Sequence, residues 1–289
     1  MDNNELLVKI WDVSHGHATY IKTPNNKHIL IDLGSGSYSD GDSFSPIIHL
    51  KENYNVDVID CCFITHPHLD HIDDILNLKE ISLMLTSLPN SVDNKSLLEN
   101  CRDCDKEKFK KYVNLTENFI HPVSEDKSLD SYDYWGAKIT VFRSQKEQVN
   151  INDVSSVFII EHEGLKVVIP GDNEKTSWEE FLENINFKKA ISDADIFLAS
   201  HHGRKSGYHD EVLKILNPRL TIISDSKFND TSYREKYGSM SRGWSVYKKG
   251  SEKIDRKTLS TYNDGCITIK IGKSSDSNKN NYLNVTTTK

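Results

Sequence analysis

The seven residues Thr65-His66-Pro67-His68-Leu69-Asp70-His71 decide most of what this chain can be. They bring three imidazoles and a carboxylate together, and these are the ligands that hold divalent metals such as zinc or manganese. His66 and His68 alternate, so in an extended backbone both can approach one ion from the same side. Asp70 and His71 follow directly and can serve a second ion beside the first. The alternative, a histidine-rich surface loop that collects metal by chance, is disfavoured because further candidate ligands recur downstream.

Composition and charge favour one large globular domain without a broad surface for nucleic acid. A chain of 289 residues can bury a substantial core, and 36% apolar content is ordinary for a globular protein. The formal charge of −7 argues against a wide basic surface, although two divalent ions would oppose it at the site itself. With no stretch of ~20 apolar residues and no signal-peptide pattern, we expect no membrane association. The odd count of five cysteines, two of them inside an apolar run, indicates reduced thiols and a cytoplasmic location.

Three apolar segments typical of buried strands run directly into candidate ligands. These segments are residues 56–64, before the histidine cluster, 165–169, before Asp172, and 196–200, before His201 and His202. A random distribution of histidine and aspartate would not give this recurrence. Asp172 could bridge two ions because a carboxylate has two oxygens, and one of His201 and His202 could complete the second ion's shell.

Asp32 also ends an apolar segment. It could orient a ligand histidine, although a turn-forming aspartate before glycine explains it equally well from the sequence. Arg204 and Lys205, next to the ligand histidines, could hold substrate phosphates or could be a solvated charge pair.

The signature His-x-His-x-Asp-His at residues 66–71 resembles the metallo-β-lactamase fold superfamily of metal-dependent hydrolases. More narrowly, the chain is similar to the soluble hydrolase domain of the ComEC-like competence proteins. The motifs that carry this narrower resemblance are Asp12 to Ala18, Ile31 to Gly34, Thr65 to Ile72, Gly171 to Glu174, His201 to Lys205 and Thr261 to Ile267. The resemblance implies an α+β fold, a four-layer αββα sandwich over residues 1–273. A helical insertion is expected at about 91–133, and a polar tail or final hairpin at 274–289.

The resemblance also implies a centre of two divalent ions, Zn²⁺ or Mn²⁺, and it assigns roles to residues. The expected metal ligands are His66, His68, Asp70, His71, Asp172, His201, His202 and, near an Asn-x-x-Ser segment, Asp153. Asp70, His202 and His17 are expected to act directly in catalysis. His17 replaces the family's aspartate and would be a catalytic acid or a substrate contact. Asp32 and Asp12 are expected to orient the ligands.

The chain departs from the superfamily pattern at two places. Many members have a further histidine before the bridging aspartate, and only His121 and His162 are available here. We interpret His121 as a loop residue and His162 as an exposed strand residue. Asp73 and Asp74 replace glycines that usually follow the cluster, which bears on how an anionic polymer would approach.

The leading functional hypothesis is a phosphodiesterase or nuclease that uses a hydroxide activated by a dinuclear metal centre. Its substrate would then be a nucleic acid or a nucleotide. One alternative is hydrolysis of a small ester, thioester or lactam, because the same metals serve acyl carbons. Another is an effector gated by a protein partner, for example in a phage-defence system, which the charged insertion motivates. The sequence does not set the oligomeric state.

Overall fold

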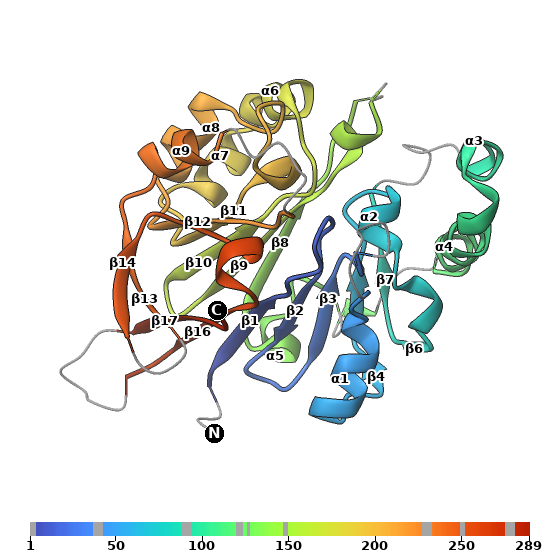
Figure 1. Cartoon of the computed structure of the whole chain (residues 1–289), viewed down its shortest axis with the longest axis horizontal. Coiled ribbons are helices and arrows are strands. Elements are labelled where there is room, and N and C mark those ends of the chain that lie inside the picture. The colour runs from blue at the N-terminus through green and yellow to red at the C-terminus, as the bar shows by residue number, and fades with distance from the viewer. Residues whose placement is uncertain are drawn as a thin grey trace.

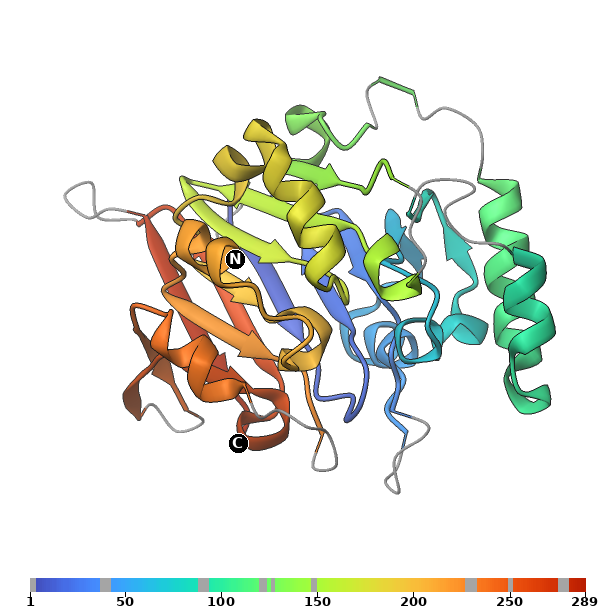
Figure 2. The same cartoon turned by 90° about the horizontal axis from the view of Figure 1, so that it is seen from above.

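Two large β-sheets face each other and carry helices on their outer faces (Figures 1 and 2). The computed structural model describes residues 4–36, 43–87, 94–119, 124–125, 128–146, 150–226, 233–248, 252–274 and 281–289. The first sheet has the strand order β14-β13-β17-β16-β1-β2-β3-β5-β7, and the second has the order β15-β12-β11-β10-β9-β8. β4 (Val58–Ile59) and β6 (Glu80–Ile81) pair separately.

The strands of the first sheet are β1 (Leu6–Ile10), β2 (Thr19–Lys22), β3 (His28–Ile31), β5 (Cys61–Phe63), β7 (Met84–Leu85), β13 (Trp244–Tyr247), β14 (Lys253–Arg256), β16 (Ile267–Gly272) and β17 (Tyr282–Thr287). The strands of the second are β8 (Lys138–Phe142), β9 (Val157–His162), β10 (Leu165–Ile169), β11 (Ile196–Leu198), β12 (Leu220–Ile223) and β15 (Thr258–Ser260). β17 forms an antiparallel pair with β16, so the chain ends in a hairpin strand.

The core lies between the two sheets and follows from the alternation of side chains along the strands. In β1, Leu6, Val8 and Ile10 are buried while the residues between them are only partly buried. These side chains belong to one apolar cluster with residues of the second sheet, such as Phe158 and Ile169. Removing this apolar surface from water is the main term that holds the sheets face to face.

Most of the helices lie in the two outer layers. They are α1 (Pro46–Tyr54), α2 (Leu69–Ile72), α3 (Asn94–Asn100), α4 (Lys106–Asn118) and α5 (Tyr132–Trp135), then α6 (Lys175–Glu183), α7 (Ile185–Ile191), α8 (Asp210–Leu216), α9 (Arg234–Ser239) and α10 (Thr261–Asp264). Short 3₁₀ helices are η1 (Ile75–Asn77), η2 (Asp103–Asp105), η4 (Ile151–Val154) and η5 (Ser200–Gly203). α6 to α9 pack on the second sheet, while α1, η1 and α4 pack on the first (Figure 1). The predicted α+β fold with an αββα layer order is therefore confirmed.

Parallel pairing brings the strand ends with candidate ligands to common sheet edges. β3 and β5 are parallel, with Ile31 opposite Phe63, so Asp32 and the histidine cluster begin at the same edge. β10 and β11 are also parallel, with Val168 opposite Phe197. The segments that follow these two strands therefore leave the second sheet together.

The region expected as an insertion contributes α4 to an outer layer. Phe109, Tyr112 and Val113 of α4 are buried in the apolar cluster over the first sheet. The Lys108 ammonium pairs with the buried carboxylate of Asp73, which directly follows α2. Asp73 and Asp74, which were expected to bear on substrate approach, are both buried, and Asp74 accepts from the Ser45 hydroxyl at the start of α1.

Within the described residues, no helix is long and apolar enough to cross a membrane.

Replacing Lys108 by alanine should destabilise the fold by about 2 kcal/mol or more, because it leaves the Asp73 carboxylate buried with less compensation. The matched control is Lys110→Ala in the same helix, since Lys110 pairs with Glu107 at the surface and such pairs contribute little. Chemical denaturation of both variants measures the difference. Equal stability of the two variants would contradict the role given to the Lys108–Asp73 pair.

Candidate metal centre

Three loops meet where the strand ends of the two sheets converge. They follow β5, β10 and β11, and they carry the histidine cluster, Asp172 and the pair His201–His202. His201 and His202 both adopt left-handed backbone, with φ of 48° and 54°. Two consecutive non-glycine residues in this region are costly, and such strain is typical of functional loops.

The first group of candidate ligands consists of His66, His68 and Asp172. One ligand atom from each lies within 4.8 Å of the others. His66 Nε2 is 3.0 Å from His68 Nδ1 and 3.8 Å from Asp172 Oδ2. His66 is fully buried, and burial together with the neighbouring His71 lowers its pKa well below the usual value. The imidazole is thus neutral, as a metal ligand must be.

The second group consists of Asp70, His71, Asp172 and His202, again within 4.8 Å of one another. His202 Nε2 is 3.1 Å from Asp70 Oδ2, and His71 Nε2 is 3.3 Å from Asp172 Oδ1. Asp172 belongs to both groups. Its Oδ1 lies 3.3 Å from His71 Nε2, and its Oδ2 lies 3.8 Å from His66 Nε2 and 3.6 Å from His202 Nε2. The carboxylate therefore contacts residues of both groups, as a carboxylate shared by two ions would.

The chemistry of these side chains, apart from any family resemblance, suits divalent cations. His71 Nε2 is buried and has no hydrogen-bond partner among the described residues. Burial alone would raise the pKa of Asp172, but His71 and His202 outweigh it and hold the carboxyl pKa well below its usual range. Imidazole nitrogens and ionised carboxylates converge here, and this mixture suits zinc, manganese or iron.

Asp32 orients one ligand histidine from behind. Its Oδ2 accepts from His71 Nδ1 at 2.7 Å and from His17 Nδ1 at 2.9 Å, and its Oδ1 accepts from the Thr65 backbone N–H at 2.8 Å. A proton on His71 Nδ1 leaves the Nε2 lone pair directed at the second group. The structure thus favours the orienting interpretation of Asp32 over a simple turn.

The two adjacent histidines of η5 take different places. The His202 ring fixes its Nδ1 on the Ser224 carbonyl at 2.9 Å, which turns Nε2 into the second group. His201 lies outside both groups. Its Nδ1 donates to Glu174 Oε1 at 2.8 Å, and its Nε2 accepts from Arg204 at 3.1 Å. His202 is therefore the candidate ligand of the second group. His201 belongs to neither group, although its Nε2 lies 3.8 Å from Asp172 Oδ2, and its binding of metal stays a prediction.

Two aspartates predicted to belong to the site make other contacts in the structure. Asp153, expected as a ligand, uses Oδ1 to accept from the Glu174 and Ser177 backbone N–H groups and from the Ser177 hydroxyl, which stabilises the start of α6. Asp12, expected to orient ligands, pairs with Lys289 at 2.6 Å. Neither belongs to a ligand group.

His17 also differs from its sequence-based prediction. It is 3% exposed, and its two ring nitrogens contact Asp32 and the Thr19 hydroxyl at 2.9 and 2.8 Å. Both of its ring nitrogens are engaged inside the protein, which disfavours the catalytic or substrate-binding role expected from the sequence. It helps to hold Asp32 in place.

One of the two spare histidines, His162, lies outside both ligand groups. His162, expected at the surface, is buried with Nε2 bonded to the Asn4 carbonyl, because β9 lies inside the second sheet. His121 lies outside the described residues.

Sequence reasoning missed His15. Its Nε2 lies 3.3 Å from Asp70 Oδ2, and its ring centroid is 4.9 Å from that of His202. The sequence signal is the run Ser14-His15-Gly16, which is typical of a tight loop. In the structure its serine and its glycine both have positive φ. Lys205, predicted to hold substrate, is exposed, while Arg204 is half-buried.

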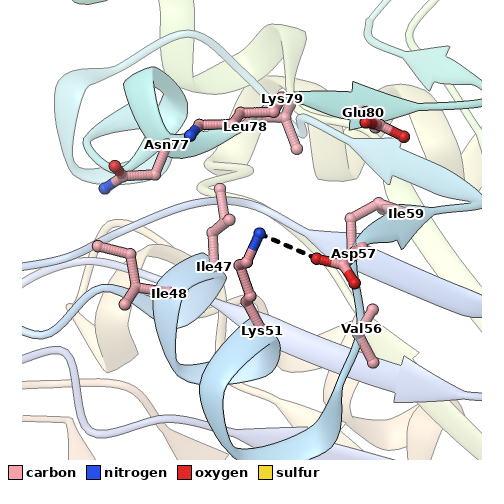
Figure 3. A pocket seen from close by; sticks show the side chains of 10 residues that line it. All are labelled: Ile47, Ile48, Lys51, Val56, Asp57, Ile59, Asn77, Leu78, Lys79 and Glu80. Carbon is pink, nitrogen blue, oxygen red and sulfur yellow. Dashed lines mark ion pairs between the residues drawn. The ribbon is translucent and has the colours of Figure 1, made fainter.

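A separate surface pocket of about 210 Å³ contains no residue of either ligand group. It lies between α1, β4 and the end of η1 (Figure 3), and the Lys51–Asp57 ion pair at 3.0 Å borders it. Its lining is Ile47, Ile48, Lys51, Val56, Asp57, Ile59, Asn77, Leu78, Lys79 and Glu80.

No family model matches the chain. It is 42% identical over 64 residues to a UPF0173 metal-dependent hydrolase of Roseiflexus castenholzii. This segment is 22% of the chain and 24% of that protein, so the match spans about a quarter of the relative.

Solved structures give weak likenesses. Zn²⁺-bound PqqB of Methylobacterium extorquens is 12% identical with a TM-score of 0.47, over 90% of this chain and 98% of that one. The long form RNase Z from yeast is 12% identical with a TM-score of 0.45, over 92% and 42%. A candidate metallo-beta-lactamase of Thermotoga maritima is 17% identical with a TM-score of 0.41, over 66% and 95%. Likenesses at these scores carry no argument about chemistry. The narrower ComEC-like resemblance stays a prediction from the motifs.

Replacing Asp32 by asparagine should lower metal affinity about 10- to 100-fold, because the amide cannot hold both His71 and His17 as the carboxylate does. Titration against a competing chelator measures the affinity. Asp60→Asn is the control, since Asp60 accepts from the His28 backbone outside both ligand groups. Parent-like affinity of Asp32→Asn would show that Asp32 does not orient a ligand.

Proposed function

We propose that this chain is a metal-dependent hydrolase of the metallo-β-lactamase superfamily and that it hydrolyses phosphodiesters, with nucleic acids or nucleotides as substrates. The observation that carries the proposal is the position of Asp172 in both ligand groups. A carboxylate shared by two groups is what a dinuclear hydrolytic centre needs. The αββα layer order and the short match to a metal-dependent hydrolase support the same class.

The chain's own residues would hold two divalent cations, Zn²⁺ or Mn²⁺. His66, His68 and Asp172 would hold one, and Asp70, His71, His202 and Asp172 would hold the other. Such ions supply Lewis acidity and make water nucleophilic at neutral pH. Asp32 and the Ser224 carbonyl keep His71 and His202 in the tautomer that presents Nε2 to the centre. The burial of these ligands keeps bulk water from competing for them.

A phosphodiester substrate is supported by the charge at the rim of the centre. The Arg204 guanidinium is held by His201 Nε2, and among the described residues no carboxylate forms an ion pair with it. Guanidinium groups bind phosphate oxygens through paired hydrogen bonds. Asp73 and Asp74, the acidic residues nearest the cluster in sequence, are turned into the protein and do not oppose an anionic substrate at the surface.

Purified protein loaded with Mn²⁺ or Zn²⁺ should cleave bis(p-nitrophenyl) phosphate and a panel of linear and cyclic nucleotides. Asp172→Asn should lose at least ~10³-fold in kcat/KM and most of its metal, because one change removes a ligand from both groups. Asp153→Asn is the matched control. The sequence predicted Asp153 as a metal ligand, but in the structure this buried aspartate belongs to neither ligand group. The activity and the metal content of Asp153→Asn should therefore stay near those of the parent.

Three outcomes would overturn the proposal in different ways. A preference for nitrophenyl esters or lactams over phosphodiesters would move the substrate to acyl compounds. Activity that appears only with added lysate from the source cell would favour gating by a partner. Equal activity of Asp172→Asn and the parent would remove the dinuclear centre from the reaction.

A further inference from the structure

We propose that the surface pocket between α1, β4 and the end of η1 binds a free aliphatic amino acid, a small zwitterion with a branched apolar side chain. The pocket contains no residue of either ligand group, so this inference goes beyond the proposed hydrolytic function and does not rest on it. The size of the pocket, its aliphatic floor and the charges of both signs at its rim together point to this occupant.

The pocket is small. Its volume of about 210 Å³ is below the ~300–1,000 Å³ that is typical of sites for drug-sized ligands. The volume therefore favours a ligand of few heavy atoms over a nucleotide or a folded segment of another protein.

The floor of the pocket is aliphatic. Val56, Ile59 and Leu78 are buried, and Ile47 is half-buried beside them. Ile48 extends this apolar surface to the outside, where it is 43% exposed. Among the described residues that line the pocket none is aromatic, so a nucleobase would find no ring to stack on. An aliphatic side chain, in contrast, gains free energy by leaving water for this floor.

The rim of the pocket carries two cationic and two anionic side chains, all exposed: Lys51, Lys79, Asp57 and Glu80. Their formal charges cancel, so the rim favours neither a simple anion nor a simple cation. Lys51 Nζ and Asp57 Oδ1 lie 3.0 Å apart, and Figure 3 shows them meeting between Ile47 and Ile59. The carboxylate and the ammonium of an amino acid are also adjacent opposite charges, and they can pair with Lys51 and Asp57 respectively.

The ion pair at the rim is free to accept such a ligand at little cost. The side chains of Lys51 and Asp57 are 66% and 65% exposed. A pair at this exposure contributes ~0–1 kcal/mol, because water screens it. The ligand can therefore add its charges to the pair, or separate its members, without a large loss of stability.

The walls of the pocket are held together by the protein itself. Asp74 Oδ2 accepts from the Ser45 hydroxyl and from the Ile47 N–H at the start of α1, at 2.8 and 2.9 Å. Its Oδ1 accepts from the Asn77 amide in η1 at 2.7 Å, so one buried carboxylate joins two walls. The pairing of β4 with β6 joins the remaining two segments. A preformed pocket of this kind loses little conformational entropy when a ligand binds.

L-Leucine is the probe, and isothermal calorimetry of the full chain measures its binding. Three analogues test the recognition: 4-methylpentanoate lacks the ammonium, 3-methylbutylamine lacks the carboxylate, and glycine lacks the side chain. Each should bind at least about tenfold more weakly than L-leucine, a loss of ~1.4 kcal/mol. Binding of L-leucine should be the same with and without Mn²⁺, because the pocket contains no residue of either ligand group.

Three exposed pocket residues can be changed without disturbing the core. Lys51→Gln and Asp57→Asn should each weaken L-leucine binding about tenfold, and Ile48→Ser should weaken it several-fold. Lys214→Gln and Asp210→Asn are the matched controls, because their ion pair on α8 is comparably exposed and lies outside the pocket. Circular dichroism of each variant checks that it is folded.

Loss of L-leucine binding in the pocket variants, with parent-like binding in the controls, supports the proposal. No binding by the folded parent at millimolar L-leucine, parent-like binding in all three pocket variants, or binding that requires Mn²⁺ would overturn it. Equally tight binding of 4-methylpentanoate or 3-methylbutylamine would overturn the zwitterionic ligand. None of these outcomes depends on cleavage of a phosphodiester, so the failure of this site and the failure of the proposed function are distinguishable.

Discussion

The buried carboxylate of Asp32 is the interaction on which the site depends. It lies at the end of β3 with φ of +58°, is fully buried, and accepts from the Thr65 backbone and hydroxyl and from His17 and His71. Burial would raise its pKa, but His71 and His17 hold the carboxyl pKa well below the usual value. An unpaired charge at this depth would be very costly, so these donors and Asp32 fix one another. Through them, the end of β3 sets the position of the whole histidine cluster.

The other ligands are connected to Asp32 through a chain of side-chain contacts. His71 connects Asp32 to Asp172, and Asp172 connects the first ligand group to the second. The Ser224 carbonyl, which follows β12, fixes His202, which follows the neighbouring strand β11 of the second sheet. The centre therefore lies between the two sheets. Its ligands come together only when both sheets are packed against each other. The apolar core between the sheets is thus a requirement for the chemistry as well as for stability.

Much of the fold and of the ligand set could be predicted from the sequence, because the patterns that indicate them are local. Apolar segments that end in histidine or aspartate predicted that the histidine cluster, Asp172 and the His201–His202 pair lie at strand ends. The αββα layer order was predicted from the family resemblance. The errors concern side-chain direction. Sequence alone could not say that the two left-handed residues of η5 turn His202 inward and His201 toward Glu174, or that Asp153 stabilises a helix start.

The same limit explains His15 and His17. They are two residues apart in one loop, and the pattern drew attention to His17 because it occupies the family's acidic position. The fold buries His17 against Asp32 and leaves His15 at the rim, an exchange that depends on Gly16 packing on the Asp70 carbonyl. Long-range backbone contacts of this kind carry no signature in the local sequence.

Anomalous X-ray diffraction from crystals of the Mn²⁺- or Zn²⁺-loaded protein would locate the ions themselves. We expect two anomalous peaks on either side of Asp172, one bound by His66 and His68 and the other by Asp70, His71 and His202. His201, Asp153 and Asp12 should bind neither ion. A single peak, a peak bound by His201, or no peak at these residues in fully loaded crystals would contradict the dinuclear centre.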